Sequence, residues 1–185
     1  MFQKQKNMVI SKNAVVPKIN IVLDGQTVDH VERFMYLGQI ITQDGRCQEE
    51  IRNRIRQAKS AFINMRDVLC CRKLNLTSRI RLLKCYVWST SLYGVETWTV
   101  SETSRKKLEA FEMWALRRMM RISWTRRLSN EHVLDLAKQK RELFSTVQIR
   151  KLVYLGHVMR HESMQRDLIE GMVEGKRGRG RPRLQ

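Results

Sequence analysis

Only two prolines occur in the chain, at Pro17 and Pro182, so no residue between them is barred from a helix by a pyrrolidine ring. Within that segment apolar residues recur at helical spacing. The clearest run begins after residue 45, and its apolar positions are Ile51, Ile55, Ala58, Phe62, Met65 and Leu69. The sequence therefore predicts a mainly α-helical fold.

Capping residues place the further helices. Thr77 or Ser78 can cap a helix that runs to about Leu92, and Ser101 can cap another over 102–122. The stretch 92–98 between them is expected to bend. A short helix is expected to open at Asn130, and a long one is expected over 140–161.

A different pattern precedes the helices. β-branched and aromatic residues cluster over 19–42, and the triplet Asp24-Gly25-Gln26 is typical of a hairpin turn. We expect strands near 19–23, 26–30 and 33–41. The fold class is thus mainly α, with a small N-terminal β-hairpin region followed by a helical bundle.

The net charge of +18, from 36 Lys and Arg against 18 Asp and Glu, concerns partners more than fold. Residues 46–128 hold most of it, with 19 basic and 7 acidic residues for a net +12. A polyanion is the natural partner of such a surface. We therefore expect DNA or RNA, as duplex or RNA–DNA hybrid, and no membrane, because no apolar run approaches the ~20 residues of a membrane span.

Two groups of basic residues on the predicted helices are candidates for backbone contacts. Arginine forks phosphate in two-point contacts, and the indoles of Trp114 and Trp124, interleaved with the second group, can stack on bases or guanidinium groups. A solvated charged face with core tryptophans is the alternative. The candidates are Arg52, Arg56, Lys59 and Arg66 in the first group, and Arg117, Arg118, Arg121, Arg126 and Arg127 in the second.

The C-terminal stretch 174–185 has no apolar run to bury and is expected to be disordered. It carries a compact basic motif made of Arg179, Gly180, Arg181, Pro182 and Arg183. This motif resembles the core of an AT-hook, in which arginines enter the narrow, negative minor groove of A/T-rich DNA. Plain attraction to phosphate is the alternative.

Catalytic chemistry has little support in the residue pattern. A polymerase or nuclease clusters carboxylates around divalent metals, but the aspartates are isolated, and the pair Glu49–Glu50 is explained by the dipole of the helix that it opens. His157 and His161 lie four apart on a predicted helix without an evident third ligand, so we expect no metal site. The four cysteines lack CxxC spacing and indicate reduced thiols in an intracellular protein.

Several segments, taken in order, resemble the C-terminal part of a non-LTR (LINE-type) retrotransposon reverse transcriptase. The resemblance covers nearly the whole chain. It rests on "KQKNMVISK" (4–12), "VERFMYLGQIITQDG" (31–45), "EIRNRIRQAKSAF" (50–62), "SLYGVETWTV" (91–100), "LEAFEMWALRRMMRISW" (108–124), "LVYLGHVMR" (152–160) and "GRGRPR" (178–183).

The resemblance implies four regions and their roles. Residues 1–45 would be the palm edge with the primer grip at Phe34, Tyr36, Leu37 and Gly38. Residues 46–128 would be the thumb that holds template–primer duplex by its backbone, 129–173 the helical region after the thumb, and 174–185 the basic tail. The family's Tyr-x-Asp-Asp motif, which binds Mg²⁺ in the full-length enzyme, would lie upstream of residue 4, so the chain looks like a fragment with no cofactor and no catalytic residue of its own.

We therefore expect a nucleic-acid-binding fragment of an RNA-directed DNA polymerase that is not an enzyme alone. One alternative is a host-adopted, chromatin-associated DNA-binding protein that uses the AT-hook-like tail. Another is a subunit that docks onto a separate, palm-containing polymerase chain. The expected DNA or RNA partner indicates an intracellular, nuclear location.

Overall fold

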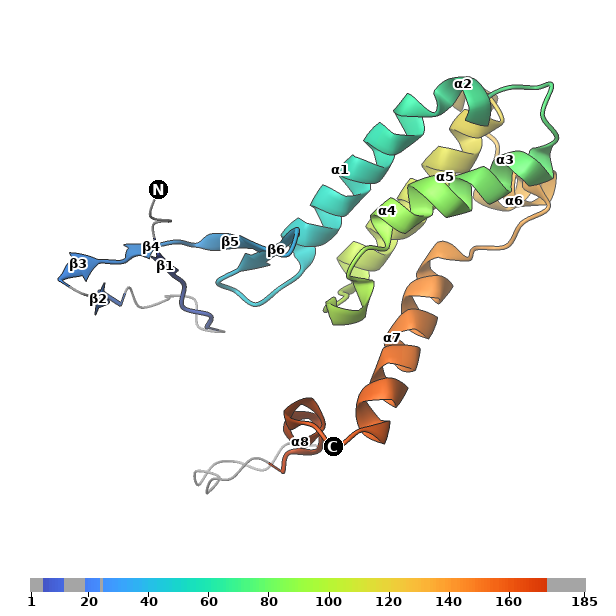
Figure 1. Ribbon diagram of the computed structural model, residues 1–185. Coiled ribbons are helices and arrows are strands. Elements are labelled where there is room, and N and C mark those ends of the chain that lie inside the picture. Colours follow the sequence, from blue (N-terminus) through green and yellow to red (C-terminus); the bar gives the residue numbers. More distant parts are fainter. Residues whose placement is uncertain (1–4, 12–18, 24, 173–185) are drawn as a thin grey trace.

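The described part of the chain begins with short strands, up to Thr42, and continues as helices from Gln48 onwards (Figure 1). The computed structural model describes residues 5–11, 19–23 and 25–172. Most of the helices form one bundle, and the strands lie at one end of it, next to the start of helix α1 (Gln48–Asn64). The predicted fold class is confirmed for these residues. The expected disorder of 174–185 concerns residues outside the described ranges.

The N-terminal region contains short two-stranded ladders. Strand β1 (Lys6–Asn7) pairs in parallel with β4 (Asp29–His30), and β2 (Val22–Leu23) pairs antiparallel with β3 (Gln26–Thr27). Gly25 has a φ of +76°, which agrees with the predicted turn at that position. The single strand predicted over 26–30 is interrupted at Val28.

The strand predicted over 33–41 is wrong in form, because the chain reverses in its middle. Strands β5 (Arg33–Tyr36) and β6 (Gln39–Thr42) pair antiparallel, with Tyr36 opposite Gln39. Leu37 and Gly38 form the two-residue turn, with φ values of +48° and +77°. Two positive φ values are what the tightest hairpin turns require. A leucine is unfavourable there, so the sequence carried no usual turn signal.

The helices follow the predicted order with shifted boundaries. The first predicted helix is divided at Met65, after which α2 (Arg66–Leu69) begins. Helix α3 (Leu76–Leu82) continues through a π-helical segment, Leu83–Trp88, into α4 (Ser89–Ser91). The remaining helices are α5 (Glu102–Met119), α6 (Asn130–Ala137), α7 (Leu143–Arg160) and α8 (Met164–Glu170), the last of which was not predicted.

Side-chain caps explain three of the starts. Ser101 accepts a hydrogen bond from the amide of Ser104 and caps α5, as predicted. Ser129 caps α6 in the same way. The cap of α3 is Asn75, whose Oδ1 lies 2.7 Å from the amide nitrogen of Ser78, so the predicted caps Thr77 and Ser78 are wrong.

One buried cluster holds the bundle together. Its largest fully buried side chains include Trp98, Phe62 and Phe111, from the bend after α4, from α1 and from α5. The same cluster takes in Val133 of α6 and Val147 of α7. The core therefore includes residues from both sides of position 128, so the regions 46–128 and 129–173 share one core.

A buried arginine joins two helix ends inside this core. Arg79 donates from Nη1 to the carbonyl oxygens of Met119 at 3.0 Å and Leu69 at 3.4 Å. These carbonyls end α5 and α2, where no intrahelical partner is left for them. A cation also suits the negative end of a helix dipole.

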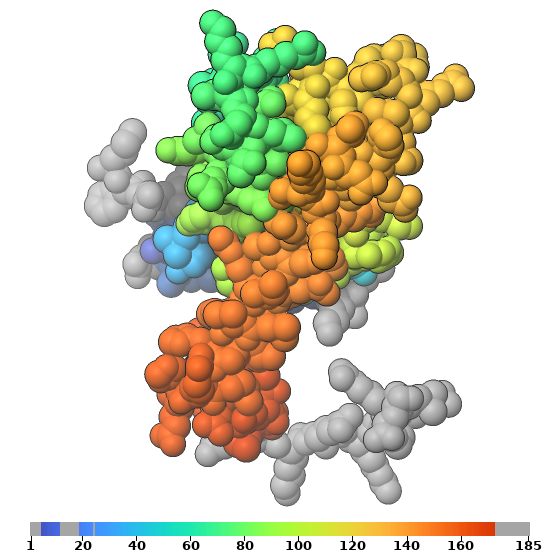
Figure 2. All heavy atoms as spheres, turned by 90° about the vertical axis from the view of Figure 1, so that its right-hand side faces the viewer, coloured from blue at the N-terminus to red at the C-terminus, as the bar shows by residue number. Residues whose placement is uncertain are grey.

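Helix α7 is fixed to the bundle at its start and middle. Lys151 donates from Nζ to the carbonyl oxygen of Trp98, and Arg150 donates to that of Leu92. The later turns of α7 and the whole of α8 project away from the bundle (Figures 1 and 2). In the middle of α7, Leu152 and Val153 are exposed. No described helix is long and apolar enough to cross a membrane.

The start of α7 rests on a buried carboxyl group. Oε1 of Glu112 accepts hydrogen bonds from the amides of Glu142 at 2.9 Å and Leu143 at 3.1 Å. Burial raises the pKa of Glu112 above its usual range, because desolvation penalises the charged form more than the two amides stabilise it.

This pKa shift predicts a pH-dependent effect of Glu112→Gln on stability. The folded-state pKa lies above the unfolded one, so ionisation at this site costs stability as the pH rises from about 4.5 through the folded pKa. Glutamine keeps the accepting oxygen and cannot ionise. In urea unfolding at a series of pH values, the variant should therefore gain stability relative to the wild type as the pH rises, and then level off. Glu112→Ala, which leaves both amides without their acceptor, should lose about 1–3 kcal/mol at every pH. A wild type that gains on the Gln variant with rising pH would contradict this.

Candidate nucleic-acid interface

The basic face predicted for the first helix is present on α1. Arg52, Arg56 and Lys59 stand four and three residues apart, so they share one side of the helix. Arg52 and Arg56 are exposed, and Lys59 is half-buried. None of the three forms an ion pair with a described residue, so their charges are available to a ligand. Arg66, the fourth candidate, is exposed on α2.

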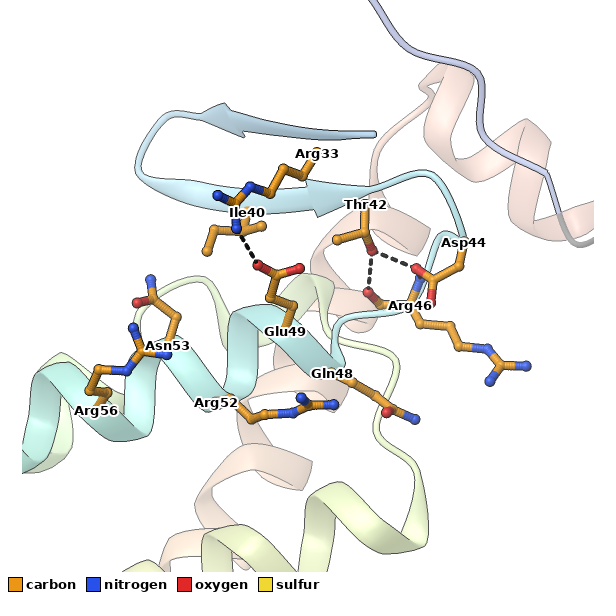
Figure 3. A pocket seen from close by; sticks show the side chains of 10 residues that line it. All are labelled: Arg33, Ile40, Thr42, Asp44, Arg46, Gln48, Glu49, Arg52, Asn53 and Arg56. Carbon is orange, nitrogen blue, oxygen red and sulfur yellow. Dashed lines mark hydrogen bonds and ion pairs between the residues drawn. The ribbon is translucent and has the colours of Figure 1, made fainter. Parts of the chain in front are cut away.

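A groove opens where this face meets the hairpin β5–β6 (Figure 3). Its volume is about 420 Å³. Arg33 reaches into it from β5 and pairs with Glu49 at 3.3 Å, while Arg46 comes from the loop before α1. Neither arginine was a sequence candidate, since only the fold brings them beside α1. The lining residues are Arg33, Ile40, Thr42, Asp44, Arg46, Gln48, Glu49, Arg52, Asn53 and Arg56.

The acidic groups of the groove are already engaged. Asp44 accepts hydrogen bonds from the Thr42 hydroxyl and from the amide of Arg46, and these lower the pKa of its carboxyl group. Glu49 is held by Arg33. Arg52 and Arg56 form no ion pair with a described acid, and the four arginines of the groove outnumber its two acidic residues, so the groove keeps a net positive charge suited to a phosphate.

The ring of Trp114 on α5 contacts a cation of α1 and a cation of α5, and so connects the basic surfaces of the two helices. The two helices run side by side in the same direction, since Cys47 contacts Thr99 at one end and the ring of Phe62 meets that of Trp114 further along. The Lys59 ammonium lies 5.2 Å and the Arg118 guanidinium 5.3 Å from the centre of the Trp114 ring. One half-buried indole thus places two cations from different helices next to each other.

The row of cations continues past the end of α5. Arg121, Arg126 and Arg127 are exposed in the turn that follows the helix, and Trp124 between them is 85 % exposed. No acidic residue occurs over 121–127. The structure therefore extends the basic surface from the hairpin groove, along α1, to the end of α5.

Arg117 differs from its neighbours because the fold uses its guanidinium. Its Nη2 donates to the carbonyl oxygen of Leu128 and to Oδ1 of Asn130, both at 2.9 Å. These bonds close the turn after α5. The structure thus gives this sequence candidate a positioning role in that turn.

The primer-grip candidates lie at the tip of the hairpin. Phe34, Tyr36 and Leu37 are exposed, by 38 %, 58 % and 75 %, and Gly38 completes the turn. An exposed apolar tip next to an arginine-lined groove is suited to contact a ligand that has both apolar and anionic parts.

Two residues that were not sequence candidates, Arg54 and Tyr93, hold the turn in place. Arg54 donates to the carbonyl oxygen of Gly38, and the Tyr93 hydroxyl donates to that of Leu37 at 3.1 Å. The Arg54 guanidinium also lies over the Tyr93 ring at 4.3 Å. The motifs at 36–39 and 92–94, distant in sequence, therefore meet in space.

Beneath them, Glu50 completes the arrangement. It pairs with Arg54 at 2.5 Å and accepts the amide of Ile40 at 2.8 Å. The two side chains are 2 % and 8 % exposed, so the reading of Glu50 as a helix-dipole residue alone is wrong. The spacing of Glu50 and Arg54 by four residues was the available signal.

The remaining sequence candidates are the basic motif of the C-terminal stretch and the two histidines of α7. Arg179, Gly180, Arg181, Pro182 and Arg183 lie outside the described residues. The rings of His157 and His161 lie 4.7 Å apart between centroids. Over the described ranges, no three His, Cys, Asp or Glu residues gather as a metal site would require.

Comparison with known proteins gives one informative similarity. The chain is 28 % identical, over 141 residues, to an uncharacterized transposon-derived protein of Caenorhabditis elegans. The match covers 73 % of this chain and 49 % of that protein, so the chain spans about half the length of this curated relative. No protein-family model and no solved structure matches. The similarity indicates that the chain derives from a transposon.

Proposed function

We propose that the chain holds nucleic acid by its phosphate backbone, as the thumb and primer-grip region of a retrotransposon reverse transcriptase. The observation that carries the proposal is the row of cations without acidic partners on α1, which Trp114 joins to Arg118 of α5. Lysine and arginine side chains bind a phosphate chain by releasing its counterions, whatever the base sequence. The similarity to a transposon-derived protein supports the same interpretation.

The position of the groove suggests how a nucleic acid would be oriented along α1. It lies at the hairpin end of α1, and Arg118 lies towards the other end. The 17 residues of α1 span about 25 Å. That length matches about seven base-pair steps of a duplex at about 3.4 Å each along its axis. A duplex or RNA–DNA hybrid that lies against α1 would meet the basic row with its phosphates, and one end of the duplex would lie towards the hairpin tip. The proposal is for binding and assigns no catalytic step.

Removal of the α1 row should flatten the salt dependence of binding. The chain in which Arg52, Arg56 and Lys59 are all replaced by alanine loses three phosphate contacts. The slope of log affinity against log salt on duplex DNA should therefore become shallower by about 2–3, at about 0.9 per contact. Fluorescence anisotropy with labelled duplex DNA and RNA–DNA hybrid over a salt series measures this.

A matched control removes the same charge elsewhere. Lys138, Lys140 and Arg160 lie on or next to α6 and α7 and are exposed. Their replacement by alanine should change the slope of log affinity against log salt much less than replacement of the α1 residues does. Equal slopes for both triple variants would show that overall charge, and not the α1 row, binds the backbone.

A second candidate function, docking onto a palm-containing polymerase chain, has one observation in its favour. Apolar side chains of the hairpin β5–β6 are exposed, among them Met35 at 65 % and Leu37 at 75 %. Large exposed apolar side chains that lie close together are typical of a protein interface. Such a partner would cover the hairpin face and leave the basic row of α1 free.

A further inference from the structure

We propose that Trp124 stacks on an unpaired nucleobase at the end of the basic row. This inference rests on the proposed function, because it needs a nucleic acid on that row. It goes beyond backbone binding, since an indole face recognises a base and not a phosphate. The ligand class is a single-stranded nucleotide segment, either an overhang or the frayed end of a duplex.

The exposure of Trp124 is exceptional within the described part of the chain. At 85 %, it is the most exposed of the large apolar side chains there. Two of the other tryptophans, Trp88 and Trp98, are buried, and Trp114 is packed against Phe62. Single exposed apolar residues are common, so exposure alone would decide nothing. The surroundings of Trp124 are what point to a ligand.

The turn that presents Trp124 is braced from several sides. Ser123 caps a short 3₁₀ turn by accepting the amide of Thr125, and the amide of Arg127 bonds the carbonyl oxygen of Trp124. Ile122 and Leu128 on either side pack against the core. Together with the hydrogen bonds of Arg117, these contacts fix the backbone of the turn, so the indole is held outward on a rigid support.

Two arginines in unusual backbone conformations flank the indole. Arg121 and Arg127 have φ values of +56° and +45°, which are uncommon for residues other than glycine. With Arg126 they supply three exposed cations within three residues of Trp124, and none pairs with a described acid. A ring face with phosphate-binding groups around it matches one nucleotide, whose flat base is linked to phosphates on both sides.

The test compares two DNA ligands with the full 185-residue chain. One is a closed dumbbell duplex, which has no unpaired end apart from its loops of non-nucleotide linker. The other is the same duplex with a single-stranded extension. The wild type should bind the extended duplex more tightly. Trp124→Ala should weaken binding to the extended duplex by about 5- to 100-fold and leave the dumbbell affinity nearly unchanged.

Trp124→Phe is the matched variant, since it keeps a ring that can stack. It should retain most of the affinity for the extended duplex. Wild-type tryptophan emission should also be quenched more strongly by the extended duplex than by the dumbbell. The difference should vanish in the Phe variant, because Trp88 and Trp98 are buried and Trp114, which lies in the basic row, meets both ligands in the same way.

Each other outcome overturns the proposal. If the wild type binds both ligands but does not distinguish them, or if Trp124→Ala weakens both equally, stacking is wrong and the backbone-binding proposal stands. Trp124 would then be a contact for another protein or a part of the charged surface. If the wild type binds neither ligand, both proposals are wrong.

Discussion

Arg54→Met should lower the free energy of unfolding by about 3–5 kcal/mol, because it leaves the Glu50 carboxylate buried without its partner. The substitution keeps most of the side-chain volume but removes the charge. It also removes the donor to the Gly38 carbonyl and the cation over the Tyr93 ring. Urea unfolding followed by circular dichroism measures the loss. A native domain has only about 5–15 kcal/mol in total, so the variant should be close to its limit.

Two further variants show whether the buried pair is the cause. Arg56→Met, two residues along the same helix but exposed, should change stability by at most about 0.5 kcal/mol. Adding Glu50→Gln to Arg54→Met removes the stranded charge and should recover part of the loss. A double variant that is no more stable than Arg54→Met would mean that packing, and not the uncompensated charge, accounts for the effect.

Trp98→Ala should cost about 3–5 kcal/mol for a different reason, the cavity left in the core. Trp98 is 1 % exposed and is among the largest fully buried side chains of the described residues. Its backbone carbonyl also accepts Lys151, so a collapse at this site would disturb the seat of α7. The measurement is again urea unfolding.

The chain supplies its own control for this substitution. Trp124→Ala removes the same side chain from a site that is 85 % exposed, and it should change stability by at most about 0.5 kcal/mol. Such a result would show that Trp98 contributes to stability and that Trp124 does not, which leaves Trp124 free for a role in binding. Similar losses for both would show that the turn after α5 belongs to the folded core.

Local signals made much of the fold predictable from sequence. The cap at Ser101 and the opening of α6 at Asn130 were both read from single residues next to periodic segments, and both are present. The turn at Leu37 was missed because its positive φ contradicts the ordinary preference of leucine. The hydrogen bonds of Arg54 and Tyr93 to that turn come from residues distant in sequence, which no local pattern reveals.

The candidate interface divides in the same way. Arg52, Arg56 and Lys59 could be placed on one helix face by spacing alone, and the structure has them there. Charge by itself did not separate surface arginines from structural ones. Arg54 and Arg117, in the same basic segments, are engaged by the fold, and only their three-dimensional neighbours distinguish them.

The way the hairpin is held has a consequence for the order in which the protein opens. Its attachments reach forward to Glu50 and Arg54 on α1 and to Tyr93 beyond α4, so they can form only after both are in place. Its outer strand β5 is exposed along its whole length, and β6, which packs on α1, is only half-buried. Elements of this kind open locally at a lower free energy than the core does. The hairpin tip should therefore be the last part to lock during folding and the first to detach, while the helices and their basic row stay assembled.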